Sequence, residues 1–252
     1  MPRTVAIVQA RMGSERLPGK VLKEVLGRPL LEYLIEQLSY SERLADAVIA
    51  TSDLPRDDVI EEAVRRFDVR VFRGSEQDVL DRYYRAAAAF DADCVVRITA
   101  DCPLICPTVV DRTIDDHFKS GCDYTMNDVP ETIPRGYDVE VFSRETLDRT
   151  YEAARRAADR EHVTYYIYTH PKKFSVNRFR DSDFPRFPTD RLCVDTEEDF
   201  EVVKAVIENV YKEGRYMHHV EVLDFLEANP APANINAGVK QKDVTEAGLK
   251  PW

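Results

Sequence analysis

The chain opens on an apolar strand that leads into a short cationic loop, and this order restricts the fold more than any other feature. The strand-like run is Thr4–Ala10, and the loop Arg11–Lys20 contains Gly13, Gly19 and three cationic side chains. In α/β proteins such a loop binds phosphate groups, because glycines let a ligand approach backbone N–H groups while cations neutralise its charge. The loop matches neither GxxxxGK[ST] nor GxGxxG, so it predicts a phosphate site of a different class.

Strands and helices alternate through the first half of the chain. The apolar runs predict strands at Thr4–Ala10, Ala47–Thr51, Val69–Phe72 and Cys94–Thr99, and the helical patterns cover Pro29–Leu38, Asp57–Phe67 and Gln77–Phe90. Strands separated by helices indicate βαβ units with right-handed crossovers. We therefore expect an α/β fold with a mostly parallel sheet.

After residue 120 the pattern changes to an antiparallel insertion. Strands are predicted at Tyr124–Asn127, Tyr137–Phe142 and Phe174–Phe179, helices at Arg144–Ala158 and Glu161–Thr169, then a strand at Arg191–Asp195 and a helix from Glu197 to about Lys212. We interpret about 121–190 as a lobe inserted in a single domain, 1–229, which returns to the sheet at Asp195. Residues 230–252 are rich in proline and are expected to form an extended C-terminal tail.

The composition narrows the functional classes. A formal net charge of −11 argues against nucleic-acid binding, although a local cationic loop can still bind a small anion. The longest apolar runs have strand length rather than the ~20 residues of a membrane span, and no signal peptide precedes the first strand. We expect a cytoplasmic protein without membrane association. The five cysteines lack the paired spacing of a zinc site and are expected to be reduced thiols.

Two aspartates stand where a ligand of an open α/β sheet binds, beyond the carboxyl ends of the strands. Asp101 and Asp195 each end a predicted apolar strand, so their carboxylates could converge and hold Mg²⁺ beside a phosphate chain. A structural interpretation fits the residues equally well. In it, Asp101 turns the chain before Pro103, and Asp195 caps the following helix with Glu198 three residues on.

A second turn of small residues, Arg73-Gly74-Ser75, follows the third predicted strand near the same rim. Arg82 lies in the next predicted helix. It could reach a nucleotide, but the residue pattern by itself favours a solvated helix charge.

Six segments, in order along the chain to about residue 210, carry a family resemblance. They are ARMGSERLPGKVL (Ala10–Leu22), RGSEQDVLDRYYRAA (Arg73–Ala87), RITADCPLI (Arg97–Ile105), GYDVEVF (Gly136–Phe142), REHVTYYI (Arg160–Ile167) and VDTEEDFE (Val194–Glu201). Together they resemble the nucleotide-sugar cytidylyltransferases, above all the spore-coat polysaccharide type. The CMP-Kdo and CMP-acylneuraminate synthetases are wider relatives.

The resemblance implies a Rossmann-like, GT-A-like nucleotidyltransferase fold of three layers, with CTP as substrate and Mg²⁺ as cofactor. It also implies a homodimer whose interface includes the inserted lobe. Its implied nucleotide-binding residues are Ala10, Arg11, Gly13, Ser14, Arg16, Lys20, Ser75, Arg82 and Thr99. The implied catalytic residues are Arg11, Arg16, Lys20 and Asp101. Asp101 and Asp195 match the family's metal ligands, which favours the metal over the structural interpretation.

Candidate acceptor residues in the insertion are Arg135, Glu140, Arg160 and His162. An arginine fork suits a sugar carboxylate. Glu140 alternates with two valines, so it faces either solvent or an acceptor hydroxyl. His162 is either a general base or a structural residue. Where CMP-Kdo synthetases carry a Gln-Gly-Asp-Glu-Pro type motif, this chain has TADCP. The sialic-acid branch has a more glycine-rich loop, so neither acceptor carries over.

The reaction expected from these residues is transfer of CMP from CTP to a sugar or acidic sugar, with release of pyrophosphate, in the synthesis of surface polysaccharide or glycan precursors. One alternative is a GT-A glycosyltransferase with a nucleotide-sugar donor. Its usual Asp-x-Asp after a strand is missing, because Asp91-Ala92-Asp93 precedes a predicted strand and Asp181-Ser182-Asp183 lies in a loop with no apolar strand before it. A nonenzymatic nucleotide-binding domain is a second alternative, but the loop and the metal positions are all intact.

Overall fold

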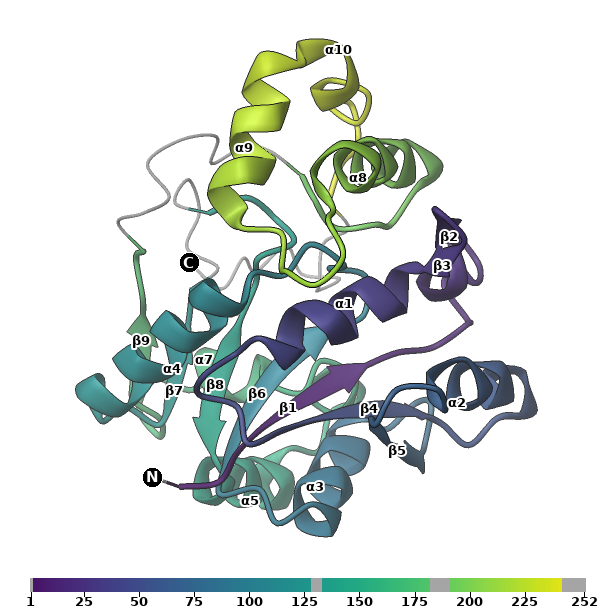
Figure 1. Ribbon diagram of the computed structural model, residues 1–252. Coiled ribbons are helices and arrows are strands. Elements are labelled where there is room, and N and C mark those ends of the chain that lie inside the picture. The colour runs from purple at the N-terminus through teal and green to yellow at the C-terminus, as the bar shows by residue number, and fades with distance from the viewer. Residues whose placement is uncertain (1, 128–132, 182–190, 242–252) are drawn as a thin grey trace.

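The computed structural model describes residues 2–127, 133–181 and 191–241 (Figure 1). At its centre is a seven-stranded sheet with the order β5-β4-β1-β6-β8-β7-β9. The strands are β1 (Thr4–Gln9), β4 (Asp46–Ser52), β5 (Arg70–Gly74), β6 (Cys94–Thr99), β7 (Tyr124–Met126), β8 (Glu140–Ser143) and β9 (Val176–Arg178). β8 runs antiparallel to both neighbours, and the other neighbouring strands of this sheet are parallel. The predicted α/β fold with a mostly parallel sheet is confirmed.

Helices cover both faces of the sheet (Figure 1). Alternate residues of β1 point to opposite faces, so Ala6 and Val8 pack in one buried cluster and Val5 and Ile7 in the other. The first cluster includes residues of α1 (Leu30–Ser39), α2 (Asp58–Val64), α4 (Pro107–Ser120), α8 (Glu197–Val210) and α9 (His219–Ala228). The second includes residues of α3 (Val79–Ala89), α5 (Arg144–Ala153) and α7 (Tyr165–Thr169). These are the three layers expected from the resemblance.

Short elements complete the chain. They are the 3₁₀ turns η1 (Lys20–Leu22) and η2 (Pro55–Asp57), the hairpin of β2 (Glu24–Val25) with β3 (Arg28–Pro29), and the helices α6 (Ala157–Glu161) and α10 (Pro230–Ala233). The predicted helix 144–158 is interrupted, because Ala154 and Arg156 adopt extended backbone angles before α6 begins. No helix in the described part of the chain is long and apolar enough to cross a membrane.

The predicted insertion continues the central sheet, since β8 pairs with β6 and β7 pairs with both β8 and β9. The strand predicted at Arg191–Asp195 is wrong. This segment makes one isolated parallel bridge, from Arg191 to Arg135, because it lies beyond the end of the sheet. It is instead held by single bonds, and one of these runs from Val194 N–H to the Asp101 carbonyl at 2.8 Å.

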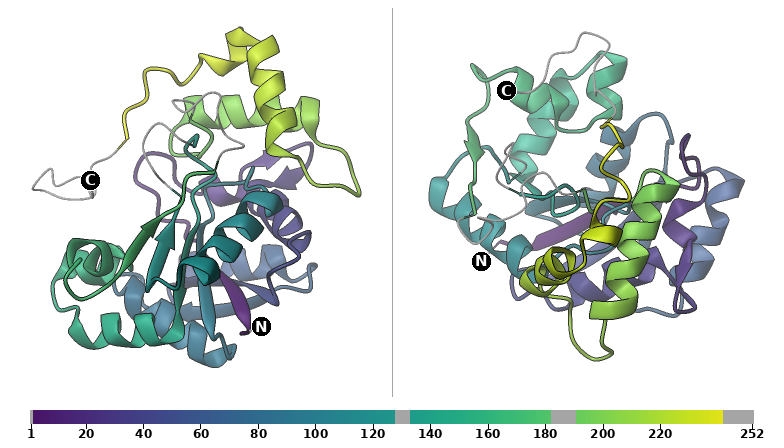
Figure 2. Two further views of the ribbon diagram at one scale, coloured as in Figure 1. Left: turned by 90° about the vertical axis from the view of Figure 1, so that its left-hand side faces the viewer. Right: turned by 90° about the horizontal axis from the view of Figure 1, so that it is seen from above.

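The prediction of an extended tail after residue 229 is wrong for its first part. Pro230–Ala233 forms α10, because a proline at the first helical position already has the helical φ angle. Residues 234–241 then run back toward the first turn of α8, where Asn236 is buried (Figure 2).

Candidate active site

The loop after β1 is folded around Met12. The Met12 carbonyl accepts hydrogen bonds from the N–H groups of Ser14 and Gly19, both at 3.0 Å. The Met12 N–H donates to Asp57 Oδ1 at 2.8 Å, and Asp57 is fully buried. Ala10, which precedes the loop, is also buried and donates from its N–H to the Ala50 carbonyl at 3.1 Å. The loop is therefore anchored at both the first and the second parallel strand.

Lys20 joins the two aspartates that the sequence places at one rim. Its Nζ donates to Asp101 Oδ2 at 2.7 Å and to Asp195 Oδ1 at 2.8 Å. Burial lowers the pKa of Lys20, but the two carboxylates outweigh it and raise the pKa above 10.5. Burial raises the pKa of Asp101, but Lys20 outweighs it and holds the pKa below 3.8. The predicted convergence of the carboxylates is confirmed, because both accept from the same Lys20 ammonium.

Asp195 also receives two arginines. Arg16 Nη2 lies 2.8 Å from Asp195 Oδ2, and Arg191 Nη2 donates to the same oxygen. The predicted structural role of Asp195 as a helix cap is wrong. Thr196 is the N-cap of α8, and Asp199 completes the capping box. Asp195 is thus left to contact cations at the carboxyl end of the sheet.

Arg11 and Gly13 lie on the open part of the loop. No hydrogen bond or ion pair joins Arg11 to another residue of the described part of the chain, although its charge helps to lower the pKa of Arg82 and His162. A Cβ on Gly13 would lie 2.7 Å from Arg56 Nη2 and 3.0 Å from Glu76 Oε1. Arg11 is therefore a cation available to a ligand, and the side chains of Arg56 and Glu76 lie against the loop at Gly13.

The solvated role that the residue pattern favours for Arg82 is wrong. Arg82 is completely buried, and its Nη1 donates to the Ser75 carbonyl at 2.6 Å. Its Nε and Nη2 have no hydrogen-bond partner among the described residues. Burial lowers the pKa of Arg82, and the Arg11 charge adds to the effect. Two buried, unpaired N–H groups next to the Ser75 turn fit a ligand that accepts hydrogen bonds.

Glu140 faces neither solvent nor the valine side of its strand. Its Oε2 accepts from Arg97 Nη1 at 2.9 Å and from Thr164 Oγ1 at 3.1 Å. Burial lowers the pKa of His162, and the charges of Arg97 and Arg11 lower it further. His162 is therefore neutral at neutral pH. Arg97 and Glu140 form an ion pair between β6 and β8, and the Arg97 charge also acts on His162.

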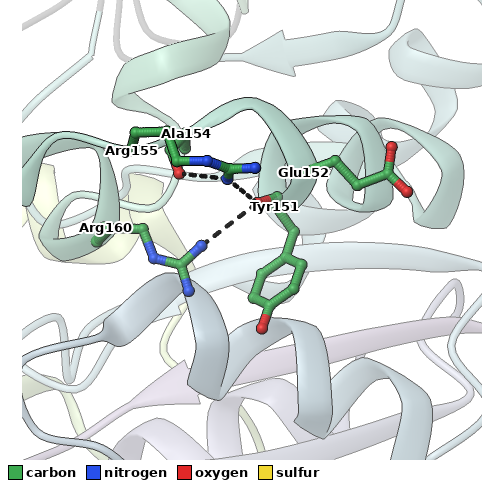
Figure 3. A pocket seen from close by; sticks show the side chains of 5 residues that line it. All are labelled: Tyr151, Glu152, Ala154, Arg155 and Arg160. Atoms are coloured by element: carbon green, nitrogen blue, oxygen red, sulfur yellow. Dashed lines mark hydrogen bonds between the residues drawn. The ribbon is translucent and has the colours of Figure 1, made fainter.

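Arg160 joins the insertion to α3. Its Nη2 lies 2.6 Å from Asp78 Oδ2, and Asp78 is the N-cap of α3. Figure 3 shows Arg160 beside a pocket of about 440 Å³ lined also by Tyr151, Glu152, Ala154 and Arg155. Arg160 Nη1 donates to the Tyr151 carbonyl in α5, and Arg155 Nη1 donates to the carbonyl of Ala154, which follows the helix. Arg160 thus has a structural partner at the segment that precedes Arg82.

Sequence reasoning missed three polar residues of this region: Arg97, Asp138 and Arg191. Asp138 Oδ1 is buried without a partner among the described residues, and Oδ2 lies 3.5 Å from Arg135 Nη1. Burial raises the pKa of Asp138, and the Asp101 charge contributes in spite of Arg135. All three lie in or beside the segments that resemble the family, and this position could have marked them as site residues. Only Arg97 has its partner, Glu140, far away in the sequence, whereas the partners of Asp138 and Arg191 lie three and four residues away.

The residues that could hold a metal are oxygen donors. Thr99 Oγ1 lies 3.4 Å from Cys102 Sγ, and Cys102 contacts Asp101 Oδ1 at 3.6 Å. No group of three His, Cys, Asp or Glu side chains in the described ranges has the arrangement of a complete metal site. Two carboxylates beside a phosphate loop fit Mg²⁺, which takes one or two carboxylates and completes its shell with phosphate oxygens and water.

The fold and this site define an α/β nucleotidyltransferase. A family model described as cytidylyltransferase matches residues 5–229, and the chain belongs to that family. The chain is thus a CTP-dependent nucleotidyltransferase.

Named relatives agree with this assignment. The spore coat polysaccharide biosynthesis protein SpsF of Bacillus subtilis is 34% identical over 90% of this chain and 95% of its own length. A 3-deoxy-manno-octulosonate cytidylyltransferase of Geobacter metallireducens is 35% identical over 44% of this chain and 43% of its own. A cytidylyltransferase structure from Leptospira borgpetersenii superposes with a TM-score of 0.85 at 29% identity, covering 96% of this chain and all of the other. The predicted resemblance is confirmed.

Proposed function

We propose that this enzyme transfers CMP from CTP to an acidic sugar, with release of pyrophosphate, for the synthesis of a surface polysaccharide or related glycan. The observation that carries the proposal is the bridge from Lys20 to Asp101 and Asp195 at the end of the phosphate loop. The name of the Bacillus relative supports a polysaccharide precursor, and that of the Geobacter relative supports a sugar acid.

The bridge couples nucleotide and metal binding. Lys20 and Arg16 neutralise the carboxylates of Asp101 and Asp195. An arriving triphosphate offers both cations a more highly charged partner, which would free carboxylate oxygens for Mg²⁺. When bound there, Mg²⁺ would neutralise charge on the phosphates during transfer. Binding of CTP and Mg²⁺ is therefore expected to be synergistic.

The other residues hold the reactants in place. Arg11, without a partner of its own in the described chain, would bind phosphate oxygens together with the loop N–H groups. Arg82 and Ser75 would contact the nucleoside. An acceptor hydroxyl oxygen attacks the α-phosphorus and its proton passes to solvent. The bond to the oxygen bridging to the β-phosphorus breaks, and pyrophosphate leaves with that oxygen. Arg16 and Lys20 would stabilise this departing charge, because positioning and electrostatics supply most of the catalysis of phosphoryl transfer.

The acceptor would bind on the insertion's side of the sheet. Arg97 and Glu140 form one polar pair there, and Arg135 with Asp138 forms another. An arginine recognises a carboxylate and a carboxylate recognises sugar hydroxyls. We propose Arg135, Glu140 and neutral His162 as acceptor contacts. Arg160 would have a structural role, because its ion pair with Asp78 holds the insertion against α3.

The test measures pyrophosphate release from CTP, UTP, ATP and GTP, with Mg²⁺ or EDTA, against panels of 2-keto sugar acids, neutral sugars and sugar phosphates. The proposal expects release with CTP, Mg²⁺ and a sugar acid, and CMP attached to the acceptor by mass spectrometry. CTP turnover with neutral sugars or sugar phosphates alone would overturn the acidic acceptor. Turnover of UDP-sugars without CTP turnover would overturn the cytidylyltransferase reaction in favour of glycosyl transfer.

We further propose that the enzyme works in the cytoplasm as a homodimer contacted through the insertion. Light scattering coupled to size exclusion would measure the mass directly. A mass equal to one chain of 28.9 kDa over the working concentration range would overturn the dimer.

A further inference from the structure

Residues 234–241, here called the C-terminal strap, lie beyond the part of the chain that the family model matches. The strap leaves α10 and runs back to the start of α8 (Figure 2). Its N-terminal half is fixed by local bonds, such as Ala237 N–H to the Asn234 carbonyl at 3.2 Å. The strap therefore has a defined conformation next to the site.

Asn236 anchors the strap. It is only 5% exposed, and its Nδ2 donates to the Arg191 carbonyl at 2.8 Å and to Asp199 Oδ1 at 2.9 Å. Asp199 is itself fully buried and accepts from Arg191 Nε at 2.9 Å and from the Asp195 N–H at 2.9 Å. Asn236 thus belongs to a buried hydrogen-bond network in which Asp199 binds both the Asp195 N–H and the Arg191 side chain.

Arg191 spans this group and the site. Its planar guanidinium contacts Asp199 through Nε, Asp195 through Nη2 and the strap residue Gln241 through Nη1. Three partners on one rigid fork fix the direction in which Nη2 meets the carboxylate. The strap also contacts the second arginine on Asp195, because the Lys240 carbonyl accepts from Arg16 Nη1 at 3.2 Å.

The three cations on Asp195 differ in what they can do when nucleotide arrives. Lys20 and Arg16 extend from the loop after β1, which in the proposed function binds the phosphates, so an arriving triphosphate would draw both away from Asp195. Arg191 comes from the segment before α8, and its remaining bonds go to Asp199 and Gln241. Arg191 is therefore the cation that stays on Asp195 throughout.

We propose that the C-terminal strap is part of the nucleotide and metal site. Asn236 and Gln241 fix Arg191, and Arg191 is a positioning residue that sets the orientation of Asp195 for the metal. This inference rests on the proposed function of Asp195.

The test compares two asparagines of the same segment. Asn236→Ala removes the buried anchor, whereas Asn234→Ala removes an exposed side chain whose one hydrogen bond among the described residues goes to the Pro230 carbonyl. The readouts are the Mg²⁺ concentration for half-maximal CTP turnover and, independently of activity, Mg²⁺-dependent CTP binding by calorimetry. Loss of hydrogen bonds to a charged group predicts a shift of about tenfold in both for Asn236→Ala, and less than about twofold for Asn234→Ala.

Two further variants distinguish an effect on the metal site from a loss of the folded structure. Gln241→Ala changes an exposed residue and should shift the Mg²⁺ dependence about threefold in the same direction, since one bond to Arg191 is lost. Arg191→Lys keeps the charge but loses the fork, so its Mg²⁺ requirement should rise more than its KM for CTP at saturating Mg²⁺. A merely structural tail would lower the melting temperature while leaving the Mg²⁺ dependence at the wild-type value.

The outcomes separate the two proposals. Wild-type Mg²⁺ dependence in folded Asn236→Ala, or in Gln241→Ala where Asn236→Ala does not fold, would overturn the role of the strap alone. Absence of Mg²⁺-dependent CTP binding in the wild-type protein would overturn the proposed function and, with it, the inference built on it.

Discussion

Lys20 neutralises negative charge at the site, because the carboxylates of Asp101 and Asp195, from distant parts of the chain, share its ammonium. Two such carboxylates would repel each other and resist ionisation without a cation between them. Lys20 stabilises the apo protein and, in the proposed reaction, moves to the departing phosphates. The same residue therefore links folding stability to catalysis.

Lys20→Met should destabilise the protein by up to about 3 kcal/mol at pH 7, because it leaves the partly buried Asp101 carboxylate without its cation. The pKa of Asp101 lies below 3.8 in the folded protein, so its stabilisation is present above 3.8 and is lost as pH falls through the folded pKa. The pKa of Lys20 lies above 10.5, so its share is present below 10.5 and is lost as pH rises through its folded pKa. Urea unfolding at several pH values measures the gap from wild type.

A matched control for this substitution is Lys23→Met. Lys23 pairs with Glu197, whose side chain is 57% exposed, so its removal should cost less than about 1 kcal/mol at any pH. If the gap between wild type and Lys20→Met has the same size at pH 3 and pH 7, the shared ion pair is not its cause.

Asp101→Asn should lower CTP turnover by roughly 10³-fold, since a metal held by the carboxylate supplies several kcal/mol of charge stabilisation. Melting curves should show that the fold is retained. The control is Asp53→Asn, an exposed aspartate just past the end of β4, which should keep wild-type turnover. Pyrophosphate release measures both, and substantial activity in Asp101→Asn would reject the proposed role of Asp101.

At the scale of elements, the site depends on the close approach of the loop before β8 to the segment before α8. Leu192 N–H donates to the Arg135 carbonyl at 2.6 Å, and Val194 N–H donates to the Asp101 carbonyl. Gly136 allows this approach, with a φ of +110° and no side chain between the two backbones. Segment 191–195 therefore lies between the Arg135 and Asp101 backbones, although it is not a strand.

Gly136→Ala should therefore disturb both stability and activity. The added Cβ would lie 2.6 Å from the Leu192 carbonyl carbon, so overpacking adds to backbone strain and we expect about 2–5 kcal/mol of destabilisation. Gly214→Ala is the control, because Gly214 has a φ of +81° with nothing within 4 Å of its Cβ. Strain alone predicts about 1–2 kcal/mol there. Equal losses of unfolding free energy in the two variants would refute the close contact.

At the scale of the whole molecule, the insertion is continuous with the nucleotide-binding half. β8 lies between β6 and β7 in one sheet, and the ion pair of Arg160 with Asp78 joins the two halves a second time. A protein with net charge −11 also gathers Arg11, Arg16, Lys20 and Arg191 around one end of this sheet. Nucleotide binding at that end should therefore stabilise the strands of the insertion as well as those of the first half of the chain.

Hydrogen exchange tests this continuity. The amides of Val141 in β8 and Val96 in β6 are paired across the sheet, so they should open together and show similar protection. CTP with Mg²⁺ at about a hundred times the dissociation constant should raise the protection of both by about 2.7 kcal/mol, and either ligand alone by less. An insertion that exchanged much faster than β6 would show that it unfolds separately.

Local sequence patterns determined the strands, the first helices, the cationic loop and the motifs of the family. These features depend on residues a few positions apart, whose apolar period and turn residues act locally. The ends of parallel strands also placed Asp101 and Asp195 at one rim. Tertiary structure alone decided that Lys20 lies between them, that Arg82 is buried, that 191–195 is not a strand and that Asn236 reaches Arg191. Each of these depends on packing between distant segments, which sets burial and hydrogen-bond partners and leaves no local period in the sequence.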